Sequence, residues 1–398
     1  MLFSLEILKA KHGDSLILHC GTTKNPKIMV IDGGPAGVFN ATLNPRLQEI
    51  KENLQNSPLP LSMVMVSHID DDHINGIKAL TDFLLQEKSS SKPLSYDIEN
   101  FWCNSFDDII GNIQLPKVAG VAANASVASV ASDALPKLKA KDSHISAVIA
   151  SVDQGRKIRN NAVTLGLQVN KPFKPLKKTN AVMVRGDVGQ KAVTVAGTKI
   201  TVIHPTGQRL EELQAEWDKE LKKAAKKDKT IKVATVAGLL VKLDTSPYNL
   251  SSIVCLVETG GKKILLTGDA RMDDIEEGLK NHKLLKNGKL EVDIFKLPHH
   301  GSVRNATASL LQKVKADHYI ISADGKYDNP DKGLLEMLEA NIKTGTVYLT
   351  YSDGENALGK KLTAFEKKLK KDDSKLKLVF RKETDPSIII DLGDKLNY

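Results

Sequence analysis

The segment Met63-Val-Met-Val-Ser-His-Ile-Asp-Asp-Asp-His-Ile-Asn-Gly76 joins an apolar run to a dense group of histidines and carboxylates, and a helical pattern follows it. The order predicts a strand over Met63–Val66, a loop that carries the polar group, and a helix over Gly76–Leu85. Carboxylates and imidazoles at this density lose hydration and repel one another unless a cation offsets both effects. The segment therefore predicts a metal site. An acidic helix cap beside two incidental histidines is the alternative that stays open.

Alternation along an extended chain points His68 and Asp70 to the same side. Asp72 and His73 would turn toward a neighbouring position as the helix begins, so that one short loop can serve two metal ions. Nitrogen and oxygen donors suit divalent zinc or manganese, with iron as a further candidate. We therefore expect two divalent metal ions as cofactors.

Two later strand ends carry further donors. The predicted strand Lys263–Leu266 runs into Thr267-Gly-Asp-Ala270 and places Asp269 at its end. The segment Asp293-Ile-Phe-Lys-Leu-Pro-His-His-Gly-Ser302 again sets a strand before a proline, paired histidines and a glycine. Three strand ends therefore carry candidate ligands.

In this order the three segments resemble the metallo-β-lactamase superfamily, whose pattern is HxHxDH after a strand, a later lone aspartate and a final histidine. The early Ile31-Asp-Gly-Gly34 is similar to the structural turn of that family. Asp70 stands where the family usually has its second histidine. This variant, with Lys-Leu-Pro-His-His-Gly-Ser302 and the opening His12-Gly-Asp-Ser15, resembles the hydrolase domain of the DNA-uptake channel ComEC and its stand-alone relatives.

The resemblance implies an α/β fold of four layers, an αββα sandwich with two facing mixed β-sheets and outer helices. It implies a single domain over residues 1–398, with irregular or inserted segments at about 115–180 and 208–248. The ligands that it implies are His68 and Asp70 for one metal, Asp72 and His73 for the other, Asp269 as the bridge and His300 as the final donor.

The first metal site lacks the histidine that the family usually carries before the strand leading to the bridging aspartate. Asn249 and His204 are both candidates for this additional ligand. A site rich in oxygen donors favours manganese or iron relative to a site of three histidines, which favours zinc.

The resemblance also suggests a mechanism. Two metals about 3.5 to 4 Å apart would lower the pKa of a bridging water, which attacks a substrate whose oxygen the metals polarise. Asp72 would orient the nucleophile, and His299 is a candidate for protonating the leaving group. A phosphodiester or nucleic acid is the expected substrate. A hydrolase of a small ester, lactone, thioester or amide is one alternative, and a non-catalytic binding or scaffold protein on the same fold is another.

The rest of the chain alternates strands and helices in two halves. Early strands are expected over Phe3–Leu8, Ser15–His19 and Lys27–Ile31, with a helix over Thr42–Asn53; later strands are expected over Thr198–Ile203, Ile253–Val257 and Ile294–Leu297. At the carboxyl terminus, a strand over Thr346–Thr350, a helix over Leu362–Leu369 and a strand over Ser387–Leu392 are expected to complete the second sheet. Val118–Ala134 fits either a loop or a helix on the body.

Other enzyme classes lack their signatures. The chain has no GxxxxGK[ST] phosphate loop, no GxSxG nucleophile turn and no GxGxxG after a strand. Gly13-Asp-Ser15 is expected to be a structural turn rather than a nucleophilic serine site.

Composition predicts a cytoplasmic protein. No apolar run approaches the roughly 18 to 20 residues of a membrane-spanning helix, and no signal-peptide pattern opens the chain. Cys20, Cys103 and Cys255 show no CxxC spacing and are expected to be buried hydrophobic residues in a reducing compartment. The net charge of +9 would attract a polyanion, but the lysine clusters Lys219–Lys232 and Lys360–Lys377 also fit solvated helix faces.

Overall fold

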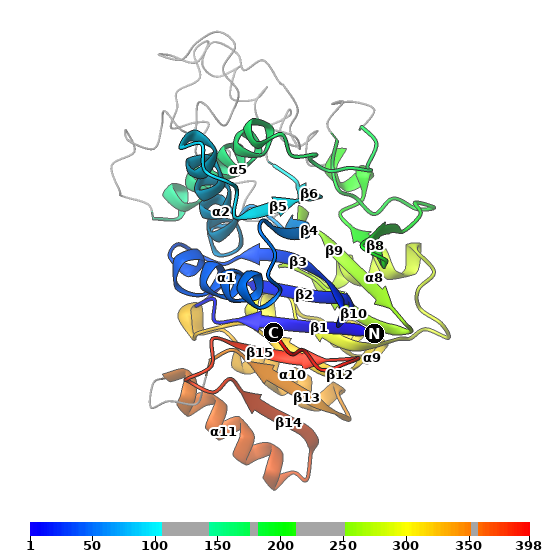
Figure 1. Cartoon of the computed structure of the whole chain (residues 1–398). Helices are drawn as coiled ribbons and strands as arrows, with labels where there is room; N and C mark the ends of the chain where they lie inside the picture. Colours follow the sequence, from blue (N-terminus) through cyan, green and yellow to red (C-terminus); the bar gives the residue numbers. More distant parts are fainter. Residues whose placement is uncertain (106–142, 176–181, 212–250, 352–356) are drawn as a thin grey trace.

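The computed structural model describes residues 1–105, 143–175, 182–211, 251–351 and 357–398 (Figure 1). Two mixed β-sheets face one another, and helices cover the outer face of each. The predicted four-layer αββα sandwich is therefore confirmed. Three features predicted from the sequence lie outside the described residues: Val118–Ala134, the lysine cluster Lys219–Lys232 and the candidate ligand Asn249.

The first sheet has the strand order β15-β1-β2-β3-β4-β5, and β6 also pairs with β4. Its strands are β1 (Leu2–Leu8), β2 (Ser15–Thr22), β3 (Asn25–Gly33), β4 (Leu59–Val66), β5 (Tyr96–Ile98), β6 (Phe101–Cys103) and β15 (Ser387–Asp391). The first three strands form an antiparallel meander, and β4 then joins β3 in parallel. This parallel step requires a crossover, which the first helices supply.

The second sheet has the order β14-β13-β12-β11-β10-β9-β8-β7. Its strands are β7 (Val193–Val195), β8 (Thr198–His204), β9 (Val254–Thr259), β10 (Lys262–Leu266), β11 (Leu290–Lys296), β12 (Val314–Ile321), β13 (Thr344–Leu349) and β14 (Lys375–Phe380). Strands β10 to β14 run parallel to one another, so their carboxyl ends lie at one edge of the sheet.

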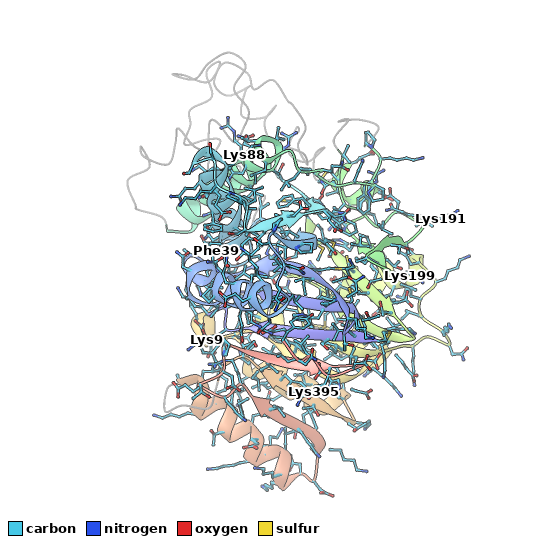
Figure 2. All side chains as sticks on the ribbon, in the orientation of Figure 1. Lys9, Phe39, Lys88, Lys191, Lys199 and Lys395 are labelled. Carbon is cyan, nitrogen blue, oxygen red and sulfur yellow. The ribbon has the colours of Figure 1, made fainter. Side chains whose placement is uncertain are left out.

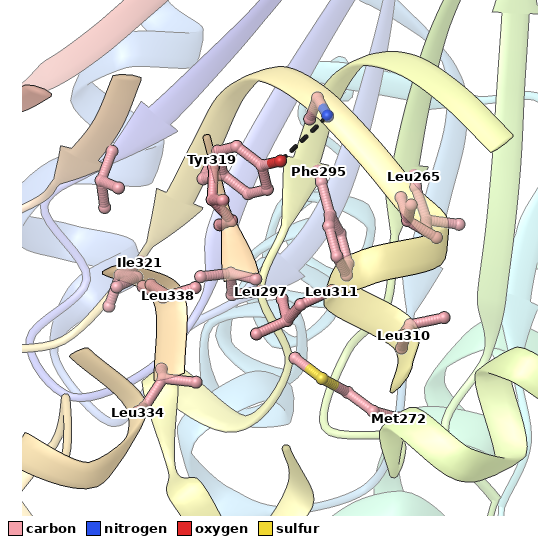
Figure 3. Packing of buried hydrophobic residues seen from close by; sticks show 14 of the residues in the cluster. Leu265, Met272, Phe295, Leu297, Leu310, Leu311, Tyr319, Ile321, Leu334 and Leu338 are labelled. Atoms are coloured by element: carbon pink, nitrogen blue, oxygen red, sulfur yellow. Dashed lines mark hydrogen bonds between the residues drawn. The ribbon is translucent and has the colours of Figure 1, made fainter. Parts of the chain in front are cut away.

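Three apolar layers hold the sandwich together. Alternate residues of both sheets, such as Leu18 and Ile264, fill the space between the sheets. Helices η1 (Phe39–Leu43), α1 (Asn44–Asn53), α2 (Asp71–Ser89) and α5 (Ser143–Leu165) belong to the layer on the first sheet. Helices α8 (Met272–Asn281), α9 (Ala308–Lys313), α10 (Lys332–Asn341) and α11 (Ala357–Lys371) belong to the layer on the second sheet. Figure 3 shows this second layer, in which Phe295 and Tyr319 of the sheet meet Leu310 and Leu338 of the helices.

Helix α2 begins at Asp71, earlier than the predicted start at Gly76. The apolar period starts only after the polar loop, whereas the first turn carries Asp71 and Asp72, which suit the positive end of the helix dipole. Asp70 is extended at the N-cap position, with φ −68° and ψ 149°, but its side chain makes no capping hydrogen bond. The alternative of an acidic cap therefore does not explain Asp70.

The prediction that the last strand belongs to the second sheet is wrong. Strands β13 and β14 extend the second sheet as expected, but β15 pairs antiparallel with β1 in the first sheet. Ser4 Oγ donates to Asp391 Oδ1 at 2.6 Å, and Ser387 Oγ donates to Glu6 Oε1 at 2.6 Å. These contacts cover the edge of β1, which would otherwise expose unpaired backbone groups. Both termini consequently lie beside β1 (Figure 1).

The described part of the predicted irregular segment at 115–180 includes the helix α5. Ile158 and Ala162 of α5 are buried in the layer on the first sheet, and Asn161 Nδ2 donates to Asp82 Oδ1 of α2 at 2.7 Å. A Cβ atom on Gly155 would lie 3.2 Å from Cγ2 of Ile69, so α5 covers the polar loop that precedes α2. This part of the segment is therefore a helix docked on the body.

The remaining sequence expectations concern surfaces and membranes. The three cysteines are free and buried, as expected. Helix α11 buries Leu362 and Phe365 and exposes Lys367 and Lys370, so the second lysine cluster includes a solvated helix face. Across the described ranges, no helix has both the length and the apolar composition needed to cross a membrane. The single domain over residues 1–398 stays a prediction.

Candidate metal centre

The candidate ligands meet where strands of the two sheets end. His68 follows β4 in the first sheet, while Asp269 follows β10 and His300 follows β11 in the second. The two sheets touch here, because the backbone nitrogen of Ile253 donates to the carbonyl oxygen of Ser67 at 2.8 Å. Binding sites of α/β proteins commonly form at the carboxyl ends of parallel strands. The topology therefore brings together side chains that are far apart in the sequence.

The first group of donors surrounds His68. Its Nε2 atom lies 3.5 Å from Oδ2 of Asp70 and 3.8 Å from Oδ2 of Asp269. The same Nε2 atom is buried and makes no hydrogen bond. Leaving a buried polar atom without a partner costs free energy, and a metal ion in contact with the lone pair would remove that cost. The geometry at His68 therefore fits a metal ligand.

The second group of donors surrounds His73 and His300. Nε2 of His73 lies 3.2 Å from Oδ1 of Asp269, and Nε2 of His300 lies 3.5 Å from Oδ2 of the same carboxylate. Asp72 Oδ2 is 3.2 Å from Nε2 of His300, and the two Nε2 atoms are themselves 3.2 Å apart. Asp269 thus lies near the histidines of both groups, and Asp70 and Asp72 each lie within 3.5 Å of one of these histidines.

Two further groups orient the imidazoles. Asp32 Oδ2 lies 2.8 Å from Nδ1 of His73, and the carbonyl oxygen of Ser322 lies 3.0 Å from Nδ1 of His300. Because both oxygens can only accept, each Nδ1 carries the proton and each Nε2 faces the cluster. Metal-binding histidines usually have such a partner on the second nitrogen. The sequence identified Asp32 only as a turn residue.

The charges of the cluster depend on one another. Burial alone would raise the pKa of Asp269, but the neighbouring His300 and His73 outweigh it and hold that pKa well below its ordinary value. Burial would lower the pKa of His73 and His300, but Asp269 and the other nearby carboxylates hold both well above 6.5. Positive charge is therefore favoured at the two Nε2 atoms, where a metal cation would sit.

A buried ion pair lies behind the second group and was not foreseen from the sequence. Asp14 pairs with Nζ of Lys296, and its Oδ1 atom is 3.6 Å from Nδ1 of His300. Burial would raise the pKa of Asp14, but Lys296 and His300 lower it to about 2. Ligand atoms of Asp14, His73, Asp269 and His300 all lie within 4.8 Å of one another. A lysine inside the apolar run Ile294–Leu297 is the signal that could have revealed the pair.

The other predicted residues lie around or outside the cluster. His299 is at the rim, with its side chain 30% exposed and Nε2 3.8 Å from Oδ2 of Asp269. His204 contributes no donor to the metal-binding groups found among the described residues. Its Nδ1 atom faces the carbonyl oxygen of Ser252 at 3.0 Å, and the ring lines a separate pocket of about 440 Å³ beside Asp274. Burial lowers the pKa of His204 to about 4.

No family model matches the chain. A segment of 119 residues is 31% identical to "ComE operon protein 3" of Bacillus subtilis and covers 28% of this chain and 15% of that protein. A segment of 79 residues is 34% identical to "Recombination protein 2" of Haemophilus influenzae and covers 20% of this chain and 9% of that protein. The chain therefore matches a small part of each relative's length. The first name agrees with the predicted resemblance to ComEC, and membership of the metallo-β-lactamase superfamily stays a prediction.

Proposed function

We propose that the chain is a metal-dependent phosphodiesterase with two divalent ions, zinc or manganese, and with iron as a further candidate. The observation that carries the proposal is the convergence of donors from separate strand ends on Asp269, next to a buried His68 Nε2 without a hydrogen bond. His68 and Asp70 would hold one ion, Asp72, His73 and His300 the other, and Asp269 both. Such ions, when bound, lower the pKa of water and polarise the oxygen of the substrate.

Asp72 is the residue that we expect to orient the attacking water. Its side chain is 20% exposed, so that it can reach both the cluster and the solvent. Burial would raise its pKa, but the contact with His300 and the charge of His73 keep the pKa well below its ordinary value. A carboxylate that stays ionised accepts a hydrogen bond well and holds a transferred proton poorly. Asp72 therefore suits positioning of the nucleophile.

His299 is the residue that we expect to deliver a proton to the leaving group. Asn305 Nδ2 donates to the carbonyl oxygen of Asp269 at 2.8 Å, which turns Asn305 Oδ1 toward Nδ1 of His299 at 2.9 Å. Nδ1 of His299 therefore carries a proton, and Nε2 gives one up only from the imidazolium form. Oδ2 of Asp269 lies 3.8 Å from that Nε2 atom.

The phosphodiester substrate rests on three supports. The chain carries a net charge of +9, which attracts polyanions. Lys88, Lys199 and Lys395 lie near the top, the right and the bottom of the molecule in the view of Figure 2, so positive charge is spread over this view. The resemblance to the hydrolase domain of a DNA-uptake channel favours nucleic acid among the phosphodiesters. A cytoplasmic location is part of the same proposal, because the three cysteines are free.

Turnover of a chromogenic phosphodiester and of single- and double-stranded DNA and RNA tests the proposal, with zinc or manganese added to tag-free full-length protein. We expect cleavage by the wild type and a loss of at least about 100-fold in Asp72→Ala with an unchanged circular dichroism spectrum. Asp97→Ala, an exposed carboxylate on β5, is the matched control and should keep full activity. Full activity in Asp72→Ala would contradict the assigned role. Cleavage of esters, lactones, thioesters or amides without phosphodiesters would favour the alternative hydrolase.

A further inference from the structure

The loop Gly325–Asp328, which we term the lip, lies beside the metal centre and presents an exposed aromatic ring. The side chain of Tyr327 is 73% exposed, more than any other large hydrophobic side chain in the described part of the chain. Nζ of Lys326, also exposed, lies 4.8 Å from the centroid of the Tyr327 ring. The lip therefore offers an exposed aromatic ring with the ammonium group of Lys326 over one of its faces.

Contacts with helix α11 hold the lip in place. Lys361 of α11 donates to the carbonyl oxygens of Asp328 at 2.6 Å and of Pro330 at 3.1 Å. Gly325 has φ +89°, and a Cβ atom there would lie 2.9 Å from Cβ of Leu358. Tyr327 itself has φ +58°, a conformation that a bulky side chain rarely adopts. Fixed contacts on α11 therefore hold the ring in the solvent.

The lip adjoins the residues that bind and position the reacting groups. Nζ of Lys326 donates to Nε2 of His12 at 3.1 Å, and the rings of His12 and Tyr327 meet edge to face with centroids 5.9 Å apart. His12 is followed by Gly13 and Asp14, whose backbone nitrogen donates to the carbonyl oxygen of Asp72 at 3.1 Å. His12 thus connects the lip to the first turn of α2.

The second connection runs to the turn that carries His300. The backbone nitrogen of Asp331 donates to the carbonyl oxygen of Gly301 at 3.0 Å. A Cβ atom on Gly301 would lie 2.8 Å from Cβ of Pro330. The lip is therefore fixed relative to both Asp72 and His300.

We propose that Tyr327 stacks on an unpaired nucleobase and that Lys326 binds an adjacent phosphate, so that the lip seats a single strand at the metal centre. This inference rests on the proposed phosphodiesterase function and specifies its substrate. An exposed ring stacks on any base face, and an ammonium group binds a phosphate oxygen. Bases in a duplex already stack on one another, so the lip selects strands with unpaired bases.

Binding of two fluorescent oligonucleotides to full-length protein tests the proposal. Both carry hydrolysis-resistant phosphorothioate linkages; one is a thymidine strand and the other an abasic strand of the same length. We expect Tyr327→Ala to weaken binding of the thymidine strand about 5- to 150-fold and to leave binding of the abasic strand unchanged, while Tyr327→Phe keeps wild-type affinity for both. Lys326→Met should weaken binding of both strands and reduce the slope of log affinity against log salt by about 0.7.

Lys289→Met is the matched control for charge. Lys289 is exposed and precedes β11, whereas His299 and His300 follow the other end of this strand. It should leave both affinities unchanged. Wild-type affinity of Tyr327→Ala for the thymidine strand, or an equal loss on both strands, would overturn the proposal. If the wild type cleaves single strands and Tyr327→Ala still binds the thymidine strand normally, the inference about the lip is wrong but the proposed phosphodiesterase function stands. If the wild type cleaves no phosphodiester, the proposed function fails as well.

Discussion

Asp32 Oδ2 accepts a hydrogen bond from Nδ1 of His73 at 2.8 Å, and both side chains are buried. The same carboxylate accepts from the backbone nitrogen and from Oγ of Ser67, each at 2.6 Å. One side chain at the end of β3 therefore fixes the end of β4 and the first turn of α2. These are the two elements that carry His68 and His73, so the orientation of both predicted ligands depends on Asp32.

Asp32→Ala should weaken metal binding about 10- to 100-fold, because His73 loses the partner that fixes its proton and ring orientation. Isothermal titration of metal-free protein with zinc or manganese measures the effect. Asp97→Ala, an exposed carboxylate in the same sheet, should bind as the wild type does. An unchanged affinity in Asp32→Ala would show that the contact with His73 does not support a ligand.

Gly76→Ala should destabilise the protein by at least about 2 kcal/mol and lower its metal affinity. A Cβ atom on Gly76 would lie 1.9 Å from the carbonyl oxygen of Gly33, so α2 would have to move away from β3 together with Asp72 and His73. Urea unfolding and metal titration measure the two effects.

Gly333→Ala in α10 is the control for Gly76→Ala, because the atom nearest to its added Cβ is Cγ2 of the side chain of Val303, at 3.1 Å, and this side chain is 36% exposed. Its free energy of unfolding should stay within about 1 kcal/mol of the wild type. Equal effects of the two substitutions would contradict a specific role of the Gly33 and Gly76 contact.

Lys296→Met should lower the free energy of unfolding by about 3 to 5 kcal/mol, because it leaves the buried carboxylate of Asp14 without its counter-ion. The double variant Asp14→Asn with Lys296→Met should be less destabilised than Lys296→Met alone. Urea unfolding in the presence of a chelator measures both. The single variant Asp14→Asn is measured alongside them. If the double variant loses as much stability as the two single variants added together, the two charges do not interact.

Glu6→Gln should cost about 3 to 5 kcal/mol at pH 7, because buried Glu6 binds Arg46 at 2.9 Å and His19 at 3.0 Å. Burial would raise the pKa of Glu6, but His19 and Arg46 hold it below its ordinary value of 4.5. The ionised form therefore stabilises the fold above about pH 4.5, and this contribution is lost as the pH falls through the folded-state pKa. The difference between wild type and Glu6→Gln should shrink in acid.

Glu49→Gln is the control for Glu6→Gln, because Glu49 binds the same Arg46 at 2.8 Å but is 58% exposed. Its effect at pH 7 should stay below about 1 kcal/mol. Urea unfolding between pH 3 and pH 7 gives both comparisons. A constant difference between wild type and Glu6→Gln over this range would contradict the lowered pKa of Glu6.

Local patterns in the sequence predicted most strands and helices and most of the donors in the cluster, whereas the four-layer sandwich was implied by the resemblance to a known family. The apolar run before Ser67 marks a strand, and donors at His68, Asp70 and His73 follow within one loop. The same pattern at Asp269 and His300 placed further donors at strand ends. Such local order is visible in a sequence because the side chains that act together are neighbours along the chain.

Pairings between distant segments were not visible. Asp14 and Lys296 meet only because β2 and β11 lie in facing sheets. The sequence around either residue does not predict that the two form a pair. The apolar run Ile388–Ile390 in β15 predicts a strand but does not indicate that its partner is β1. His204 matched a ligand by residue type alone, and its ring instead faces the carbonyl oxygen of Ser252.

The most direct test of the metal centre is the metal content of tag-free full-length protein, measured by elemental mass spectrometry after incubation with zinc or manganese and removal of free ions. We expect about two ions per chain in the wild type, and one or fewer in Asp269→Asn, because Asp269 contacts the donors of both groups. Wild-type protein that retains no metal would contradict the account and leave a binding or scaffold role.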